Sequence, residues 1–208
     1  MGGAVEIAPE RAPGALLAKG ALGRADQVAL LADIEAVLAD APPYRLSTRR
    51  GQPLSVRMSA AGRYAWFSDR RGYRYVEAHP LTGRGFPPIP PLALAQWRRF
   101  ETRAAPDGCL INLYAEGARM GLHQDRDEAD FSFPVVSISL GDPALFRIGG
   151  TARGGSTRSV WLESGDVLAL TGESRLAFHG IDRIKPGTSD LLAEGGRINI
   201  TLRRVAPA

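Results

Sequence analysis

The sequence of 208 residues contains one cysteine, Cys109, so no disulfide bond can form within it. A single thiol fits a reducing compartment better than a secreted protein. Nothing resembles a signal peptide, and no apolar stretch reaches the roughly 18 residues that a membrane-spanning helix needs. No segment recurs at a fixed period, which excludes a repeat architecture. These absences predict a cytoplasmic protein with no membrane partner.

The overall composition is that of an ordinary globular protein, with 44% hydrophobic and 23% charged residues. A chain of this length supports one well-buried core with extensions rather than two domains. Lys and Arg number 26 against 22 Asp and Glu, which gives a net charge of +4. This charge favours anionic partners such as nucleic acid, but only weakly, because many basic proteins bind no polyanion.

The first half of the chain predicts a loose arm followed by an extension of helices and hairpins. Residues 1–16 are rich in Ala, Gly and Pro and lack a helical or strand period, which indicates the arm. A helix is predicted from Asp26, which can cap free backbone N–H groups, to the stop at Pro42. Pro91 is well placed to begin a second helix that ends before Pro106. Short runs with Gly and aromatic residues predict hairpins. The hairpin segment spans 44–80, and the whole extension spans 17–106.

Residues 107–208 carry short strands separated by turns, which is typical of a sandwich or barrel. The two upstream helices would cover one sheet face, so we expect a mainly β fold with flanking helices. The Gly-rich stretch 149–156 is expected to be a mobile loop and not a phosphate cradle, because no helix follows it. The predicted strands are 109–114, 135–140, 144–148, 159–162, 166–170, 176–179 and 197–203.

Three residues form a candidate metal site. His123 and Asp125 are two apart, so on an extended segment both side chains leave the same face. His179 stands at the end of an apolar strand and is one of only three histidines in the chain. Two imidazoles and one carboxylate leave one side of an ion open, an arrangement that suits non-haem Fe(II). The alternatives are a surface polar pair for the first two residues and a hydrogen-bonded core residue for His179. We expect the third histidine, His79, to lie at the surface.

The C-terminal strand supplies a candidate anion site. On a strand, Arg197, Asn199, Thr201 and Arg203 point to one face, and the intervening apolar residues point to the other. Two guanidiniums can form paired hydrogen bonds with the carboxylates at the two ends of a 2-oxo dicarboxylate. The alternative is an edge strand with a solvated polar face. Asn112 and Tyr114 show the same spacing of two and could donate to the same ligand, or be a turn residue and a half-buried strand aromatic, respectively.

These motifs resemble those of the AlkB family of Fe(II)- and 2-oxoglutarate-dependent nucleic-acid dealkylases. The resemblance lies in CLINLYAEGARMGLHQDRDEADFSFPVVSISLGDPALFRIGG, in GESRLAFHG and in RINITLR, which follow one another in the family's order. It extends more weakly upstream through Met58 and the segment 66–75. Position 170 departs from the pattern, since Leu170 stands where the best-known members carry a large aromatic residue.

The resemblance implies a double-stranded β-helix, or jelly roll, that binds Fe(II) through His123, Asp125 and His179. It implies that 2-oxoglutarate has Arg197 and Tyr114 near one end, with Arg203, Asn112 and Asn199 near the other. It also implies that O2 is consumed and that 1-methyladenine and 3-methylcytosine are demethylated, with release of succinate, CO2 and formaldehyde.

The candidate substrate-binding residues follow from the same resemblance and from the chemistry of nucleobases. An enzyme that acts on a base must draw it from the stack and hold it between flat or apolar groups. The candidates on the hairpin segment are Met58, Trp66 and Tyr73, with Asp127 to favour a cationic base and Arg153 to face the substrate. Without the resemblance, the aromatic residues are more typical of packing, and Asp127 and the arginines of a solvated surface. The expected partner is single-stranded DNA, with duplex DNA or RNA as further options, and the protein is expected to be a monomer.

Two other classes of function stay open at this point. One is a 2-oxoglutarate dioxygenase that acts on a protein or a small molecule, because metal and co-substrate residues do not specify the substrate. The other is a non-catalytic nucleic-acid-binding module, which the intact metal motif disfavours.

Overall fold

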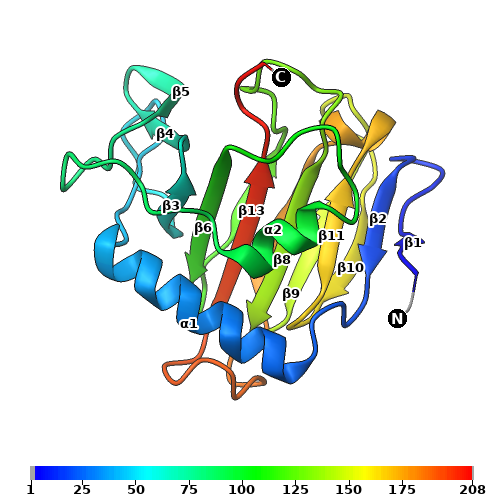
Figure 1. The fold of residues 1–208 in the computed structure, drawn as a ribbon. Coiled ribbons are helices and arrows are strands. Elements are labelled where there is room, and N and C mark those ends of the chain that lie inside the picture. The colour runs from blue at the N-terminus through cyan, green and yellow to red at the C-terminus, as the bar shows by residue number, and fades with distance from the viewer. Residues whose placement is uncertain (1–2, 208) are drawn as a thin grey trace.

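Two antiparallel sheets form the body of the computed structural model, which describes residues 3–207 (Figure 1). The larger sheet has seven strands, in the order β1 (Val5–Glu6), β2 (Ala15–Ala18), β11 (Val167–Leu170), β8 (Val135–Gly141), β13 (Arg197–Arg203), β6 (Gly108–Tyr114) and β3 (Arg57–Gly62). The smaller sheet has four, in the order β10 (Arg158–Leu162), β9 (Ala144–Ile148), β12 (His179–Ile184) and β7 (Met120–His123). A separate hairpin pairs β4 (Ala65–Asp69) with β5 (Gly72–Val76).

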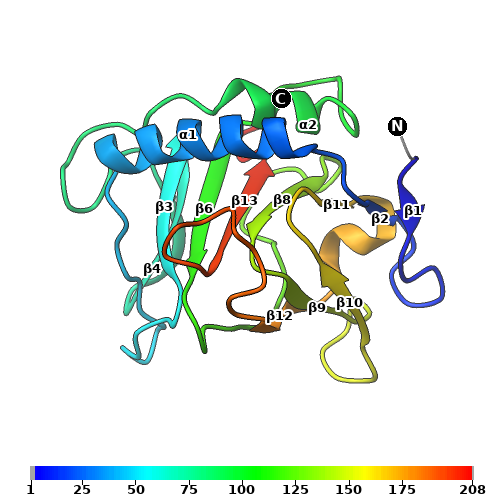
Figure 2. The ribbon, with the colours of Figure 1, turned by 90° about the horizontal axis from the view of Figure 1, so that it is seen from below.

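The two helices cover the outer face of the larger sheet, and the smaller sheet lies on its other side (Figure 2). Helix α1 (Arg24–Asp40) buries Leu30, Ile34 and Val37, and helix α2 (Pro91–Trp97) buries Trp97. On β13 the apolar side chains Ile198, Ile200 and Leu202 join these helices in one core cluster. Because side chains alternate along a strand, the polar residues of β13 point between the sheets. This arrangement is the jelly roll that the resemblance implied.

The predicted strands of the core are present, with one exception. The segment predicted as a strand at 176–179 is wrong, because residues Gly172–Leu176 form the 3-10 helix η1 and β12 begins only at His179. A capping box between Thr171 and Ser174 satisfies the backbone N–H groups that start this turn. The 149–156 loop and the β4–β5 hairpin agree with the sequence, and β7 is a strand that it did not predict.

The prediction of a loose arm over residues 1–16 is wrong for its described part. Strand β2 pairs along its whole length with β11, and β1 pairs with β2. Pro13 accepts the N–H of Ser174 at 2.8 Å, which fastens this segment to η1. The small residues that suggested disorder are the ones that pack closely here, since Ala12 and Ala15 are buried. Residues 1–2 lie outside the described part.

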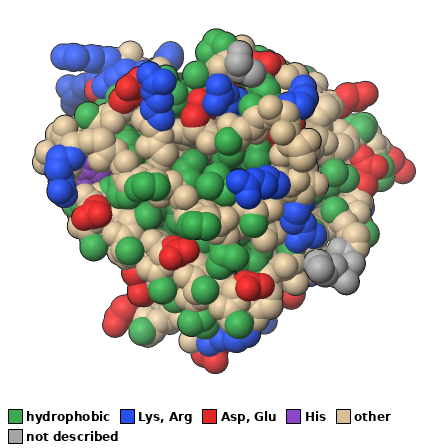
Figure 3. Space-filling model, in the orientation of Figure 1, with side chains coloured by type: hydrophobic (Ala, Val, Ile, Leu, Met, Phe, Trp, Pro, Cys, Tyr) green, Lys and Arg blue, Asp and Glu red, His purple; other side chains and the backbone are tan. Residues whose placement is uncertain are grey.

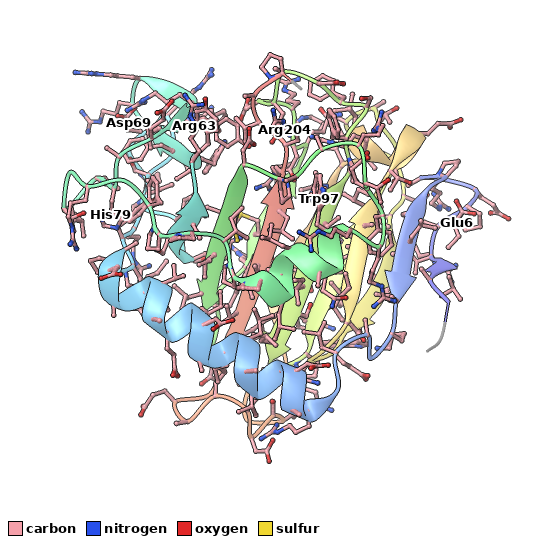
Figure 4. All side chains as sticks on the ribbon, viewed as in Figure 1. Glu6, Arg63, Asp69, His79, Trp97 and Arg204 are labelled. Carbon is pink, nitrogen blue, oxygen red and sulfur yellow. The ribbon has the colours of Figure 1, made fainter. Side chains whose placement is uncertain are left out.

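The helix boundaries and His79 also differ from the expectations. Helix α1 begins at Arg24, so Asp26 lies in its first turn and is not the cap. Helix α2 ends at Trp97, whose indole N–H donates to the carbonyl of Ala104 at 2.9 Å. His79, labelled in Figure 4 on the loop after β5, is buried and not at the surface, because its ring packs edge-on against Tyr44. No helix among residues 3–207 has the length and apolar content needed to cross a membrane.

Candidate metal centre and co-substrate pocket

A cavity of about 610 Å³ lies between the two sheets and opens beside the β4–β5 hairpin. Its size is typical of a pocket for a small ligand. Polar faces of β13 and β6 form one wall, and β7, β12 and the loop after His123 form another. The sequence-predicted residues that line it are Met58, Trp66, Tyr73, Asn112, Tyr114, His123, Asp125, Asp127, Arg153, His179, Arg197, Asn199, Thr201 and Arg203.

His123, Asp125 and His179 converge at one point of this cavity. One ligand atom from each lies within 4.8 Å of the other two. The Nε2 atoms of His123 and His179 lie 3.8 Å and 3.7 Å from the Asp125 carboxylate oxygens. The pairing of β12 with β7 sets His179 directly opposite His123, which brings residues 56 positions apart in the chain side by side. The predicted convergence in space is confirmed.

The hydrogen bonds of both imidazoles leave the right nitrogen free to bind an ion. Nδ1 of His123 lies 2.9 Å from the carbonyl of Gly121, and Nδ1 of His179 lies 2.9 Å from the carbonyl of Ala177. Each Nδ1 therefore carries the proton, so each Nε2 has a lone pair that it can donate, together with the Asp125 carboxylate, to a shared cation. Burial lowers the pKa of His179 to about 4, so its ring is neutral at physiological pH, as a metal ligand must be.

A buried charge network surrounds the carboxylate of Asp125. Burial alone would raise its pKa, but Arg203, whose Nη2 donates to Asp125 Oδ2 at 2.8 Å, and the two imidazoles hold the pKa well below its usual range. Arg175 of η1 donates to the backbone carbonyl of Asp125 at 2.6 Å and to Glu128 at 3.0 Å. Glu128 also accepts the hydroxyl of Tyr75, at 2.5 Å. Asp125 is thus kept ionised and fixed from two sides.

Arg197 and Tyr114 form a buried cationic site at the other end of the cavity, which we call the socket. Nη2 of Arg197 donates to Ser139 at 2.9 Å, but Nε and Nη1 are buried and have no hydrogen-bond partner within the described residues. Burial lowers the pKa of this guanidinium and raises the pKa of Tyr114, whose ring lies under it at 5.3 Å, to about 12. A buried donor without an acceptor is costly, so this pair of nitrogens indicates a site built for an anion.

Asn112 and Asn199 lie between the socket and the metal site. The antiparallel register of β13 and β6 sets Asn199 opposite Asn112 and Arg197 opposite Tyr114, so all four face the cavity. Asn199 donates to Ser137 at 2.5 Å, and Thr201 donates to Asn199 at 3.0 Å. Asn112 Oδ1 is buried without a partner in the described residues. β13 is a central strand, not the solvated edge strand that was the alternative.

The predicted substrate residues border the mouth of the cavity. Trp66 and Tyr73 stack with ring centroids 5.4 Å apart, and the Trp66 indole donates to Asp127 at 2.8 Å. Met58 lies deeper and is buried. Arg153, on the 149–156 loop, places its guanidinium 5.2 Å from the ring of Phe178. Aromatic faces and a carboxylate therefore lie side by side at the entrance.

Comparisons with known proteins agree with this geometry. The model of the 2OG-Fe(II) oxygenase superfamily matches residues 14–203. The alpha-ketoglutarate-dependent dioxygenase AlkB homolog of Caulobacter vibrioides is 57% identical over 190 residues, which cover 89% of this chain and 86% of that protein. The alpha-ketoglutarate-dependent dioxygenase AlkB of Escherichia coli is 39% identical over 201 residues, which cover 94% and 92%. The chain belongs to the AlkB family.

A solved structure extends the likeness of this AlkB-family chain to the fold. The structure titled "The structure of OsALKBH1" superposes with a TM-score of 0.78 at 33% identity and covers 92% of this chain and 96% of that one. The protein is an Fe(II)- and 2-oxoglutarate-dependent dioxygenase, and its family uses Fe(II), 2-oxoglutarate and O2. Its own residues fit these groups, since two Nε2 atoms and a carboxylate converge and two nitrogens of the buried Arg197 guanidinium have no acceptor among residues 3–207.

Sequence reasoning missed two residues of this AlkB-family site, Glu128 and Arg175. Both are almost completely buried, with side chains 1% and 2% exposed, and they form an ion pair at 3.0 Å. Arg175 stands in GESRLAFHG and Glu128 directly follows Asp127, so both lay inside motifs that were already singled out. An arginine on a short polar turn gives no sign of burial in the sequence, because its partner is 47 residues away.

Proposed function

We propose that this dioxygenase demethylates alkylated nucleobases, 1-methyladenine and 3-methylcytosine, in single-stranded DNA, and that it acts as a monomer. The observation that carries the proposal is the Trp66–Tyr73 stack beside Asp127 at the mouth of the metal cavity. Both lesions are cationic, and aromatic faces next to a carboxylate favour a flat cation over a neutral base. The relatives from Caulobacter and Escherichia are named AlkB or AlkB homolog, and a fission-yeast relative that is 32% identical over 113 residues is named tRNA demethylase.

In this proposal, His123, Asp125 and His179 hold Fe(II), which activates O2 with electrons from 2-oxoglutarate when both are bound. Arg197 and Tyr114 bind one carboxylate of the co-substrate, because Nε and Nη1 of Arg197 are buried donors with no acceptor in the described part of the chain. Asn112 and Asn199 orient its other end, and Arg203 lies on that side in contact with Asp125. The neutral ring of His179 and the ionised carboxylate of Asp125 can bind a cation without loss of a proton at physiological pH.

The residues on the hairpin side of the pocket bind the substrate base. Trp66 and Tyr73 receive the base that leaves the stack, and Met58 closes the apolar wall behind it. Asp127 is held by the Trp66 indole, so its charge stays directed at the mouth. Arg153, on the 149–156 loop that also lines the cavity, contacts the phosphate backbone. The base is thereby positioned with its methyl group towards the triad.

Mass spectrometry of methylated oligonucleotides tests the proposal. Single-stranded oligomers with one 1-methyladenine or 3-methylcytosine are incubated with Fe(II), 2-oxoglutarate and O2, alongside duplex DNA and RNA versions. The expected result is loss of one CH2 in mass per repaired base, with one succinate formed for each. Trp66→Ala is the matched variant, since it keeps the metal and co-substrate residues.

The proposal is contradicted if a substrate other than a methylated oligonucleotide stimulates succinate formation. Turnover that rises with peptides or small metabolites and stays at background with every methylated oligonucleotide would mean that the hairpin serves a different substrate. Binding of oligonucleotides without any mass change would instead support a non-catalytic module.

A further inference from the structure

The positive charge of this protein is concentrated at one end of the molecule. Residues 48–77 contain seven arginines and two carboxylates, a net charge of +5, while the whole chain carries +4. The rest of the chain is therefore slightly negative. Figure 3 shows Lys and Arg side chains gathered over the end that bears the β4–β5 hairpin. The mild overall charge thus hides a strongly polarised surface.

Four of these arginines form one exposed group, which we call the arginine patch: Arg49, Arg50, Arg70 and Arg71. Two loops bring them together. A Cβ added at Gly72 would meet the guanidinium of Arg49 at 3.3 Å, and one added at Gly51 would meet that of Arg70 at 3.1 Å, so each loop lies under a side chain of the other. The nearby Asp69, labelled in Figure 4, is occupied by Arg74 through two hydrogen bonds of 2.9 Å.

No ion pair neutralises the patch within the described residues 3–207, although other exposed arginines such as Arg24 and Arg63 have carboxylate partners. Four like charges on two touching loops repel one another, which costs stability unless a ligand compensates. The patch is therefore a candidate for binding an extended polyanion.

The patch connects directly to the pocket. The guanidinium of Arg49 lies over the ring of Tyr73 at 4.9 Å, and Tyr73 stacks on Trp66. Thr48, the residue before Arg49, lines the cavity itself. A strand whose base enters the pocket beside this aromatic pair would pass its next phosphates over the patch. Arg153, on a different loop, also lines the cavity.

From this geometry we infer that the arginine patch binds the phosphates of the nucleic-acid strand on one side of the extruded base, beyond the pocket. The inference rests on the proposed function, but its test is a binding measurement and does not require turnover. The patch reads no base and recognises phosphodiester charge alone. The enzyme thereby binds a strand that extends away from the pocket in one direction, whether or not that strand carries a lesion.

The test compares Arg50→Gln/Arg71→Gln with Arg98→Gln/Arg99→Gln. The control removes the same charge next to helix α2, on the outer face of the larger sheet. We expect the patch variant alone to lose affinity for a long unmethylated oligonucleotide. Each phosphate contact on a single strand contributes about 0.7 to the slope of log K against log salt, so loss of two contacts lowers the slope by about 1.4.

Oligonucleotides with the lesion at the first or the last nucleotide sharpen the test. Because the patch lies on one side of the mouth, the variant should weaken binding to one of these two oligonucleotides and leave the other unchanged. Equal effects on both, or equal slopes for the two variants, would overturn the inference. If the wild-type protein repairs a methylated trinucleotide while the slopes are equal, the proposed function stands and the patch alone is refuted.

A second, independent observation concerns Asp142, in the turn between β8 and β9. Its buried carboxylate has no cationic partner among the described residues and accepts four backbone N–H groups, from Gly187, Thr188, Ser189 and Gly196, at 2.9–3.1 Å. These bonds hold its pKa below the ordinary value, although burial alone would raise it. Asp142 therefore fastens the whole loop between β12 and β13.

This loop ends at the co-substrate socket. Gly196 has a φ of +86° and lies so close to Tyr114 that a Cβ would meet its carbonyl oxygen at 2.5 Å. The next residue is Arg197, so the position of Gly196 fixes the position of the Arg197 backbone. The geometry points to Asp142 as a positioning residue for Arg197, acting through Gly196.

The variant Asp142→Asn keeps the shape of the side chain but turns one acceptor oxygen into a donor. We expect the KM for 2-oxoglutarate to rise about 10- to 100-fold, as outer-sphere changes do, with a much smaller change in kcat. Hydrogen exchange of the wild-type free protein should show the amides of residues 187–189 and 196 protected. Thr188→Ala, which removes only the hydroxyl contact to Lys185, is the control. Fast exchange of these amides, or an unchanged KM in a folded variant, would refute the role.

Discussion

Replacement of Arg197 by methionine should make the free protein more stable and abolish its response to 2-oxoglutarate. The guanidinium is 2% exposed and two of its nitrogens have no acceptor in the described structure. A buried charge that has no carboxylate partner among the described residues and only one neutral hydrogen-bond acceptor, Ser139, costs more than an apolar side chain of similar length. Its replacement should therefore raise the free energy of unfolding of the free protein. The same two nitrogens would donate to the co-substrate carboxylate.

The size of the effect follows from these two hydrogen bonds. Each hydrogen bond to a charged group contributes about 1.5–3 kcal/mol, so losing both costs about 3–6 kcal/mol of binding free energy. Since about 1.4 kcal/mol corresponds to a factor of ten, 2-oxoglutarate should bind roughly 100- to 20,000-fold more weakly. Ligand concentrations that stabilise the wild type should then leave the variant unchanged.

Thermal unfolding under anaerobic conditions with Fe(II), with and without 2-oxoglutarate, measures both effects. Arg204→Met is the control, because Arg204 directly follows β13 and pairs with Asp107 outside the cavity. The control should keep the full ligand-induced shift. An Arg197→Met protein that is less stable than the wild type and still shows that shift would refute the assignment of the socket.

Three other changes test separate parts of the structure. Arg175→Met removes the 3.0 Å ion pair of the buried Glu128, which keeps Arg203 at 3.4 Å, and should lower the free energy of unfolding by roughly 1.5–3 kcal/mol in denaturant titrations, whereas a neutral effect would mean that the network is dispensable. Trp66→Ala removes a stacking face and should raise the KM for methylated oligonucleotides about 5- to 150-fold without raising that for 2-oxoglutarate; a rise in both would place Trp66 elsewhere. Burial raises the pKa of the Cys109 thiol to about 12, so the folded state keeps this proton as pH rises above the ordinary value of 9.0 and loses stability there relative to the unfolded state. Thiol labelling at mildly alkaline pH should therefore follow unfolding, and rapid labelling of folded protein would contradict the burial.

The sequence alone predicted which side chains face the cavity where residue chemistry and the two-residue period of a strand agree. Alternation along 197–203 separated the apolar face from the polar one, and the structure places them against the helices and in the cavity. The spacing of His123 and Asp125 predicted a shared face, but only the pairing of β12 with β7 brings His179 to them. The resemblance supplied that tertiary information in advance.

Other features depend on contacts between distant residues, which local patterns do not encode. The small residues before Leu16 suggested a loose arm, yet pairing with β11 makes an edge of the sheet from them. His79 looked like a loop residue, but its Nε2 lies 2.9 Å from the carbonyl of Pro42 in a buried setting. The role of Asp142 likewise depends on hydrogen bonds to backbone N–H groups 45 to 54 residues further along the chain.

We expect His123, Asp125, His179 and Arg197 together to bind Fe(II) and 2-oxoglutarate in this one cavity. Absorption spectroscopy after anaerobic addition of Fe(II) and 2-oxoglutarate measures this binding. A metal-to-ligand charge-transfer band should appear that needs both additions and disappears in His179→Ala. A folded wild-type protein that shows no such band, or a His179→Ala protein that retains it, would mean that these residues do not form the site.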